Sequence, residues 1–168
     1  IGLVVIFSGH LALAAYLRNI NKAARPTAYA YADPVQASFA SRTMLLSGLV
    51  IFAFLIYHLL HFTLGVTDPS SHQLTDANGH HDVYSMVVLS FQNVIVSGAY
   101  IVAMLFLGLH LSHAISSVVQ TLGFMSATAR PWVERGALTL AGILTFGNIS
   151  IPFSVLLGII GLPEGVSS

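Results

Sequence analysis

Four long apolar stretches, separated by short polar connections, constrain this chain more than any other feature. They run about 1–17, 43–66, 84–124 and 136–162. A helix needs roughly 20 apolar residues to cross a bilayer, and it satisfies its own backbone hydrogen bonds in lipid. Only 7% of the residues are charged, whereas a soluble domain carries about 25%. We therefore predict an all-α membrane protein, a transmembrane bundle with four spans that forms a single domain over 1–168.

The first and third stretches depart from the usual length of a span. A helix over 84–124 would be longer than a bilayer is thick, at about 1.5 Å per residue. One of its ends must therefore project into water or run along the membrane surface. The first stretch is short and begins with Ile1 inside an apolar run. We expect that a helix precedes it and is missing from this sequence.

The basic residues predict the orientation of the bundle. All six lie in or beside two of the three connections: Arg18, Lys22, Arg25, Arg42, Arg130 and Arg135. In a chain with four spans these two connections share one side of the membrane. The positive-inside rule makes that side cytoplasmic. The remaining connection, 67–82, has no Lys or Arg and is expected on the outside.

Five of the eight histidines fall within apolar stretches: His10, His58, His61, His110 and His113. Ionisable side chains at membrane depth are costly and commonly functional. Counted along each helix from the cytoplasmic edge, His10 lies about 12 Å deep and His113 about 14 Å deep. Two imidazoles at one depth on different helices suit the two axial positions of a haem iron. We therefore predict that His10 and His113 ligate one haem, with hydrogen-bonded packing as the alternative role.

The other intramembrane histidines are assigned with this haem in view. His58 lies about 24 Å deep and has no convincing partner in the sequence, so a second haem would need a histidine on the missing helix. His110 and His61 each lie one turn from a better candidate, and we expect them to pack or form hydrogen bonds. Arg18, two turns from His10 on the same face, could meet a haem propionate.

Three further histidines, His72, His80 and His81, lie in the outer connection together with aspartates. A solvated loop is the favoured interpretation, and a metal-binding or proton-collecting loop is the alternative. The chain has no cysteine, which excludes disulfides, thiolate-bound zinc and Cys-ligated iron–sulfur clusters within it.

Three segments resemble one protein family. The segments "SGHLALAAYLRN", "SGLVIFAFLIYHLLHF" and "LGLHLSHAISSVVQTLG" look like the second, third and fourth helices of the single-polypeptide, di-haem cytochrome b558 subunit of succinate dehydrogenase and fumarate reductase. The resemblance implies five helices in the full family, with one axial histidine on each of the first four. By position, it assigns His10 and His113 to the haem b nearer the cytoplasm. It assigns His58 to the second haem.

The resemblance also implies a function. The family anchors a flavoprotein and an iron–sulfur subunit to the bacterial cytoplasmic membrane, and passes electrons between them and a quinone, commonly menaquinone. A further anchor subunit or a second copy of the chain would be an additional partner. Some family members carry a glutamate two residues before the fourth-helix histidine, which is proposed to carry protons. Leu111 stands at that position here, so the resemblance does not extend to a proton path.

Two alternatives stay open. The chain could be a b-type cytochrome subunit of another membrane oxidoreductase, such as a hydrogenase or formate dehydrogenase. It could also be a metal or proton transporter that uses the intramembrane histidines and the His-rich loop. All six acidic residues lie outside the spans, which counts against a transporter, because transporters of divalent ions usually pair His with carboxylates.

Overall fold

The computed structural model describes residues 2–24 and 39–162, and within these ranges it is helical, with no strand. Four helical segments are long and apolar enough to cross a membrane: α1 (Gly2–Ala23), α3 (Met44–His58) continued by the π-helical turn η1 (Leu59–Thr63), α6 (Val94–Thr121) and α7 (Arg130–Leu156). Three short helices join them: α2 (Phe39–Arg42), α4 (Pro69–His72) and α5 (Val83–Gln92). The predicted all-α protein with four candidate spans is confirmed at this level.

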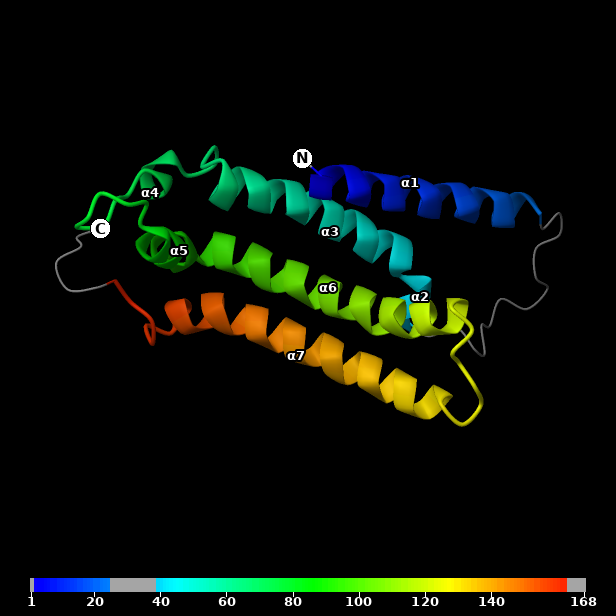
Figure 1. Cartoon of the computed structure of the whole chain (residues 1–168). Helices are drawn as coiled ribbons and strands as arrows, with labels where there is room; N and C mark the ends of the chain where they lie inside the picture. Colours follow the sequence, from blue (N-terminus) through cyan, green and yellow to red (C-terminus); the bar gives the residue numbers. More distant parts are fainter. Residues whose placement is uncertain (1, 25–38, 163–168) are drawn as a thin grey trace.

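The third apolar stretch is not one helix, because the chain breaks at Asn93. This residue has an extended backbone (ψ 115°), and its side chain accepts hydrogen bonds from the backbone N–H groups of Ile95 and Val96. An Asn in this position caps the start of a helix. In Figure 1, α5 is seen nearly end-on while α6 runs across the picture. The excess length therefore turns across the end of the bundle.

The ends of two other predicted spans also shift. The first helix continues past Arg18 to Ala23, and the last runs over Arg130–Leu156 instead of 136–162. Helices need not stop where charge begins, because long basic side chains keep their charged ends in water while their stems stay in apolar surroundings. After α7, Gly158 adopts φ +69°, a left-handed conformation that commonly ends a helix.

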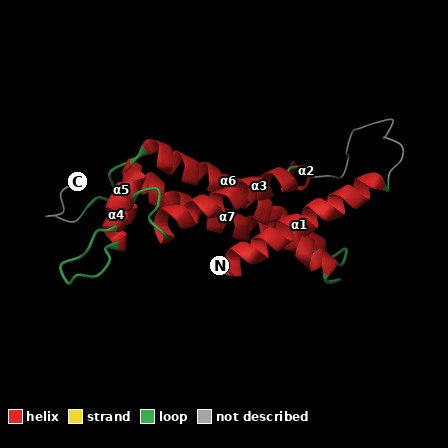
Figure 2. Ribbon diagram, turned by 90° about the horizontal axis from the view of Figure 1, so that it is seen from above, coloured by secondary structure: helices red, strands yellow, loops and turns green. Residues whose placement is uncertain are grey.

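The long helices lie side by side with α6 in the middle. It packs along α7 on one side and α3 on the other, while α1 contacts α3 from outside. Figure 2 shows α1 lying at an angle to the other long helices. The two helices α6 and α7 approach closely at Gly108, where an added Cβ would collide with the side chain of Thr145.

The buried core lies at the end of the bundle that α5 crosses. A cluster of Val88, Phe91, Tyr100 and Val155 joins α5, α6 and α7 there. In contrast, none of the residues of α1, all of them within the described range, is buried. The other end of the bundle, between α1, α3 and α6, is accordingly more open.

Candidate cofactor site

A cavity of about 700 Å³ lies between α1, α3 and α6. We call it the arginine-end cavity, because Arg18 and Arg42 are among its lining residues. His10 enters it from α1 and His110 from α6, and most of the remaining wall is apolar. Its volume falls in the range of small-molecule and cofactor sites, which combine an apolar lining with a few polar groups.

The two histidines of this cavity have their ring centroids 6.4 Å apart, with the ring planes at 75°. An imidazole nitrogen lies about 2.0 Å from a bound metal ion, so each ring centroid lies about 3.2 Å from the metal. Two imidazoles on opposite sides of one ion therefore have centroids about 6.4 Å apart. The separation of the His10 and His110 ring centroids equals this distance.

The hydrogen bonds of His110 leave the other ring nitrogen available to a ligand. Its Nδ1 lies 3.0 Å from Ser47 Oγ, and the Ser47 hydroxyl donates to the carbonyl of Met44 at 3.1 Å. A hydroxyl has one proton, so Ser47 accepts the hydrogen bond from Nδ1–H of His110. The lone pair of His110 is then on Nε2. Histidines that bind metals are commonly oriented by such a bond to their second nitrogen.

Gly48 also helps to position the His110 ring. A Cβ at this position would lie 3.4 Å from Cε1 of His110, so the imidazole packs directly against the backbone of α3. The consecutive Ser47 and Gly48 therefore orient His110 by one hydrogen bond and one close contact.

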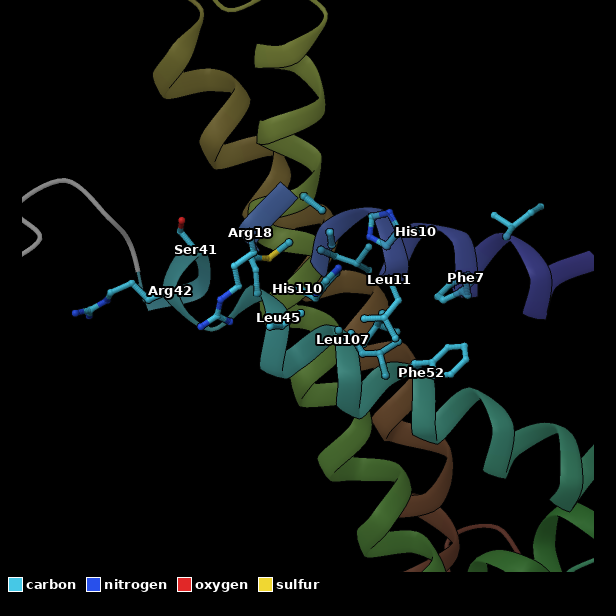
Figure 3. Close-up of a pocket in the computed structure, with 17 residues that line it drawn as sticks. Phe7, His10, Leu11, Arg18, Ser41, Arg42, Leu45, Phe52, Leu107 and His110 are labelled. Atoms are coloured by element: carbon cyan, nitrogen blue, oxygen red, sulfur yellow. The ribbon is translucent and has the colours of Figure 1, made fainter. Parts of the chain in front are cut away.

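The two arginines differ in direction. In Figure 3 the side chain of Arg42 extends away from the other labelled groups, whereas Arg18 lies beside α2 and the start of α3. Arg18 is thus the better-placed cation for an anionic group of a ligand in the cavity. This is the residue that the sequence singles out for a haem propionate.

In the structure the ring of His110 lies next to that of His10, whereas the predicted haem pair is His10 with His113. His113 lies three residues after His110 on α6, and it lines neither the arginine-end cavity nor the second cavity described below. Within the described residues, the ring of His10 contacts that of His110, and no such ring contact joins His10 to His113. The ligation of haem by His113 stays a prediction.

The remaining intramembrane histidines lie toward the opposite end of the bundle. A cavity of about 860 Å³, which we call the loop-end cavity, is lined by His58, Tyr100, His72 and His81 among others. The Tyr100 hydroxyl lies 3.4 Å from Nδ1 of His58 and 3.0 Å from Nδ1 of His61. His61 is only 3% exposed, in keeping with the packing role expected for it. Within the described residues, the rings next to His58 are those of Phe54, Phe62 and Tyr100, and a second axial ligand for it stays a prediction.

Ser47 and Tyr100 are the site residues that the sequence interpretation missed. Ser47 lies about three turns before His58 on the same face of α3, so the helical periodicity could have directed attention to it. Tyr100 precedes His110 on α6 by nearly three turns, in a stretch that reads as ordinary apolar sequence. Its role depends on α3 lying beside α6.

Comparisons of the chain with known protein families, with curated proteins and with solved structures found no match.

Within the described residues, no group of three or more His, Cys, Asp or Glu side chains is arranged to hold a metal ion.

Proposed function

We propose that the chain is a haem b-binding membrane subunit that passes electrons, of the kind that anchors a succinate:quinone oxidoreductase. The observation that carries the cytochrome part is the 6.4 Å spacing of the His10 and His110 rings across an apolar cavity. The anchor part depends on the resemblance of the three segments. The bacterial cytoplasmic membrane, the flavoprotein and iron–sulfur partners, and menaquinone follow from that resemblance.

Three polar residues of the arginine-end cavity, together with Ser47 behind His110, have distinct tasks in this proposal. His10 and His110 would hold the haem iron, and Ser47 holds the His110 ring in one tautomer and orientation. Arg18 pairs with a propionate, since guanidinium groups form strong hydrogen bonds to carboxylates. The apolar lining keeps water from the centre. A bound haem supplies a one-electron carrier whose potential depends on its axial ligands and their hydrogen bonds.

The choice of ligands is open to a direct test. Geometry favours His10 with His110, whereas the resemblance favours His10 with His113. His58 is proposed for a second haem toward the loop end. We expect dithionite-reduced membranes that contain the protein to show a b-type α-band. Replacing His10 or His110 by alanine should abolish the haem at the arginine end, whereas His113→Ala should retain it.

Two serines of similar size provide a finer comparison. Ser47→Ala removes the partner of His110 Nδ1 and should weaken haem retention about 10- to 100-fold. Ser112→Ala, whose hydroxyl donates only to the Leu109 carbonyl on its own helix, should leave retention unchanged. A b-type band that survives His110→Ala but not His113→Ala would support the pair from the resemblance. The absence of any b-type band would overturn the cytochrome proposal.

The partner subunits require a separate experiment. The protein, purified gently from its native membrane, should bring with it a flavoprotein that oxidises succinate. A haem-containing protein that co-purifies with a hydrogenase or formate dehydrogenase would instead favour another membrane oxidoreductase. Measurement of haem per chain then distinguishes one haem from two, and so decides whether His58 serves as a ligand.

A further inference from the structure

Two histidines of the loop between η1 and α5 face each other at the loop end of the bundle. His72 is the last residue of α4, and His81 lies two residues before α5. Their ring centroids are 4.8 Å apart and the ring planes are inclined at 44°. We propose that His72 and His81 bind a divalent transition-metal ion such as Cu²⁺ as adjacent ligands. This site is separate from the arginine-end cavity and does not depend on the proposed function.

The separation of the rings is the first argument for this site. With each ring centroid about 3.2 Å from a bound metal ion, two ligands at 90° to 110° have centroids about 4.5–5.2 Å apart. The observed 4.8 Å lies within this interval. The 6.4 Å spacing of His10 and His110 corresponds instead to ligands on opposite sides of an ion. The two histidine pairs therefore differ in the angle at which their rings could meet a metal ion.

Hydrogen bonds within the loop order the backbone next to His81. The Asp82 N–H donates to the Leu74 carbonyl at 2.9 Å, and the Asp76 N–H donates to the His80 carbonyl at 2.8 Å. Asp82 caps α5 by accepting from the Ser85 N–H at 3.0 Å. A loop that is ordered before binding loses less entropy when it takes up an ion.

The surroundings of His72 fix its ring further. Gly65 adopts φ +63°, and any Cβ there would collide with the His72 side chain. The imidazole therefore lies directly on the backbone at Gly65, and a larger residue would displace it. His72 is half-buried by this contact while His81 is exposed, so an ion between the rings would keep access to solvent.

The third histidine of the loop is not part of this pair. His80 Nδ1 lies 3.6 Å from an Asp76 carboxylate oxygen, and its side chain is 80% exposed. Since no third protein ligand joins His72 and His81 within the described residues, water would complete the coordination. Two imidazole ligands completed by water suit Cu²⁺. Both histidines also line the loop-end cavity, so the ion would lie at its wall.

The test is a titration of the full-length chain with Cu²⁺ in detergent micelles, after removal of metals with EDTA. Electron paramagnetic resonance reports Cu²⁺ apart from any ferric haem, and its pulsed form counts the imidazoles bound to the ion. We expect one saturable Cu²⁺ per chain with two imidazole ligands. His81→Ala should leave one imidazole and weaken binding about tenfold or more. It changes an exposed side chain, so the fold should persist, as circular dichroism would verify.

His80→Ala is the matched control, because it removes a neighbouring exposed histidine outside the pair. It should leave the affinity and the imidazole count unchanged. His72→Asn, which retains a side chain against Gly65, should lose one imidazole as His81→Ala does. A single imidazole on the ion in the unmodified chain, an effect of His80→Ala equal to that of His81→Ala, or no saturable binding would overturn the proposal.

Discussion

Tyr100 is the residue on which the contacts at the loop end converge. Its hydroxyl lies between the Nδ1 atoms of His58 and His61, and its ring meets Phe54 and Phe91 edge-on with centroids 4.9 Å and 5.0 Å away. A phenol has a single proton to donate. It therefore donates to one imidazole and accepts from the other, so the two histidines hold complementary tautomers.

Tyr100→Phe should reveal the contribution of this hydroxyl. The ring contacts stay, but the buried Nδ1 of His61 loses its partner, at a cost of about 1–3 kcal/mol. The measurement is unfolding by SDS in mixed micelles. Tyr84→Phe is the control, because its hydroxyl donates to the Gly161 carbonyl at an exposed position and should matter less. Equal losses of stability in the two variants would contradict this account of Tyr100.

At the level of single residues, the sequence predicts a haem pair of His10 and His113, whereas the structure brings the rings of His10 and His110 within 6.4 Å. Depths counted from Arg18 took the arginine as the edge of the membrane, yet α1 continues past it to Ala23. A shift of one turn is about 5.4 Å, which is more than the distance along the helix between His110 and His113. The hydrogen bond from His110 to Ser47 depends on the approach of α3 to α6, which no local pattern encodes.

Among the elements, the contact between α6 and α7 depends on small side chains. Gly108 faces Thr145 so closely that even a methyl group would not fit. Apolar helices in lipid gain little from hydrophobic burial against each other, so small residues that permit close packing are important for their association. Gly98, on the same helix, has open space where a Cβ would be.

Alanine substitutions at these two glycines should have opposite effects. Gly98→Ala should stabilise the protein by about 0.5–1 kcal/mol, because alanine is the better helix former. Gly108→Ala gains the same helix propensity but must separate α6 from α7, so it should be destabilising. Thermal unfolding of the two variants in one detergent provides the comparison. A Gly108→Ala protein as stable as Gly98→Ala would show that α6 and α7 do not approach here.

The four candidate spans were predictable because a long apolar stretch with few charges has few folds open to it other than a membrane-spanning helix. The break between α5 and α6 was not. Apolar residues continue on both sides of Asn93, so the excess length indicated only that one end leaves the membrane-spanning direction. The side chain of Asn93 caps α6, but an isolated Asn in an apolar stretch can equally lie within a helix. The tertiary contacts of α5 with α7 and the core determine the outcome.

For the whole molecule, the orientation in the membrane is the first property to test. The His-rich loop and the connection between α6 and α7 lie at opposite ends of the bundle (Figure 1). Asn78 belongs to the first and Thr128 to the second, and both are exposed. The sequence contains no cysteine, so single cysteines can be introduced without background. In intact cells, a membrane-impermeant maleimide should label Asn78→Cys, and it should label Thr128→Cys only after permeabilisation. The reverse pattern would contradict the orientation that the basic residues predict.

The absence of buried residues on α1 has a consequence for how the protein matures. This helix is held by its contacts with α3, while the other long helices share a packed interior. A group bound between His10 and His110 would bridge α1 to α6, and its binding free energy would then add to that of helix docking. Insertion of the chain and closure of the bundle would thus be separate events, and the supply of cofactor would set the lifetime of the half-assembled protein in the membrane.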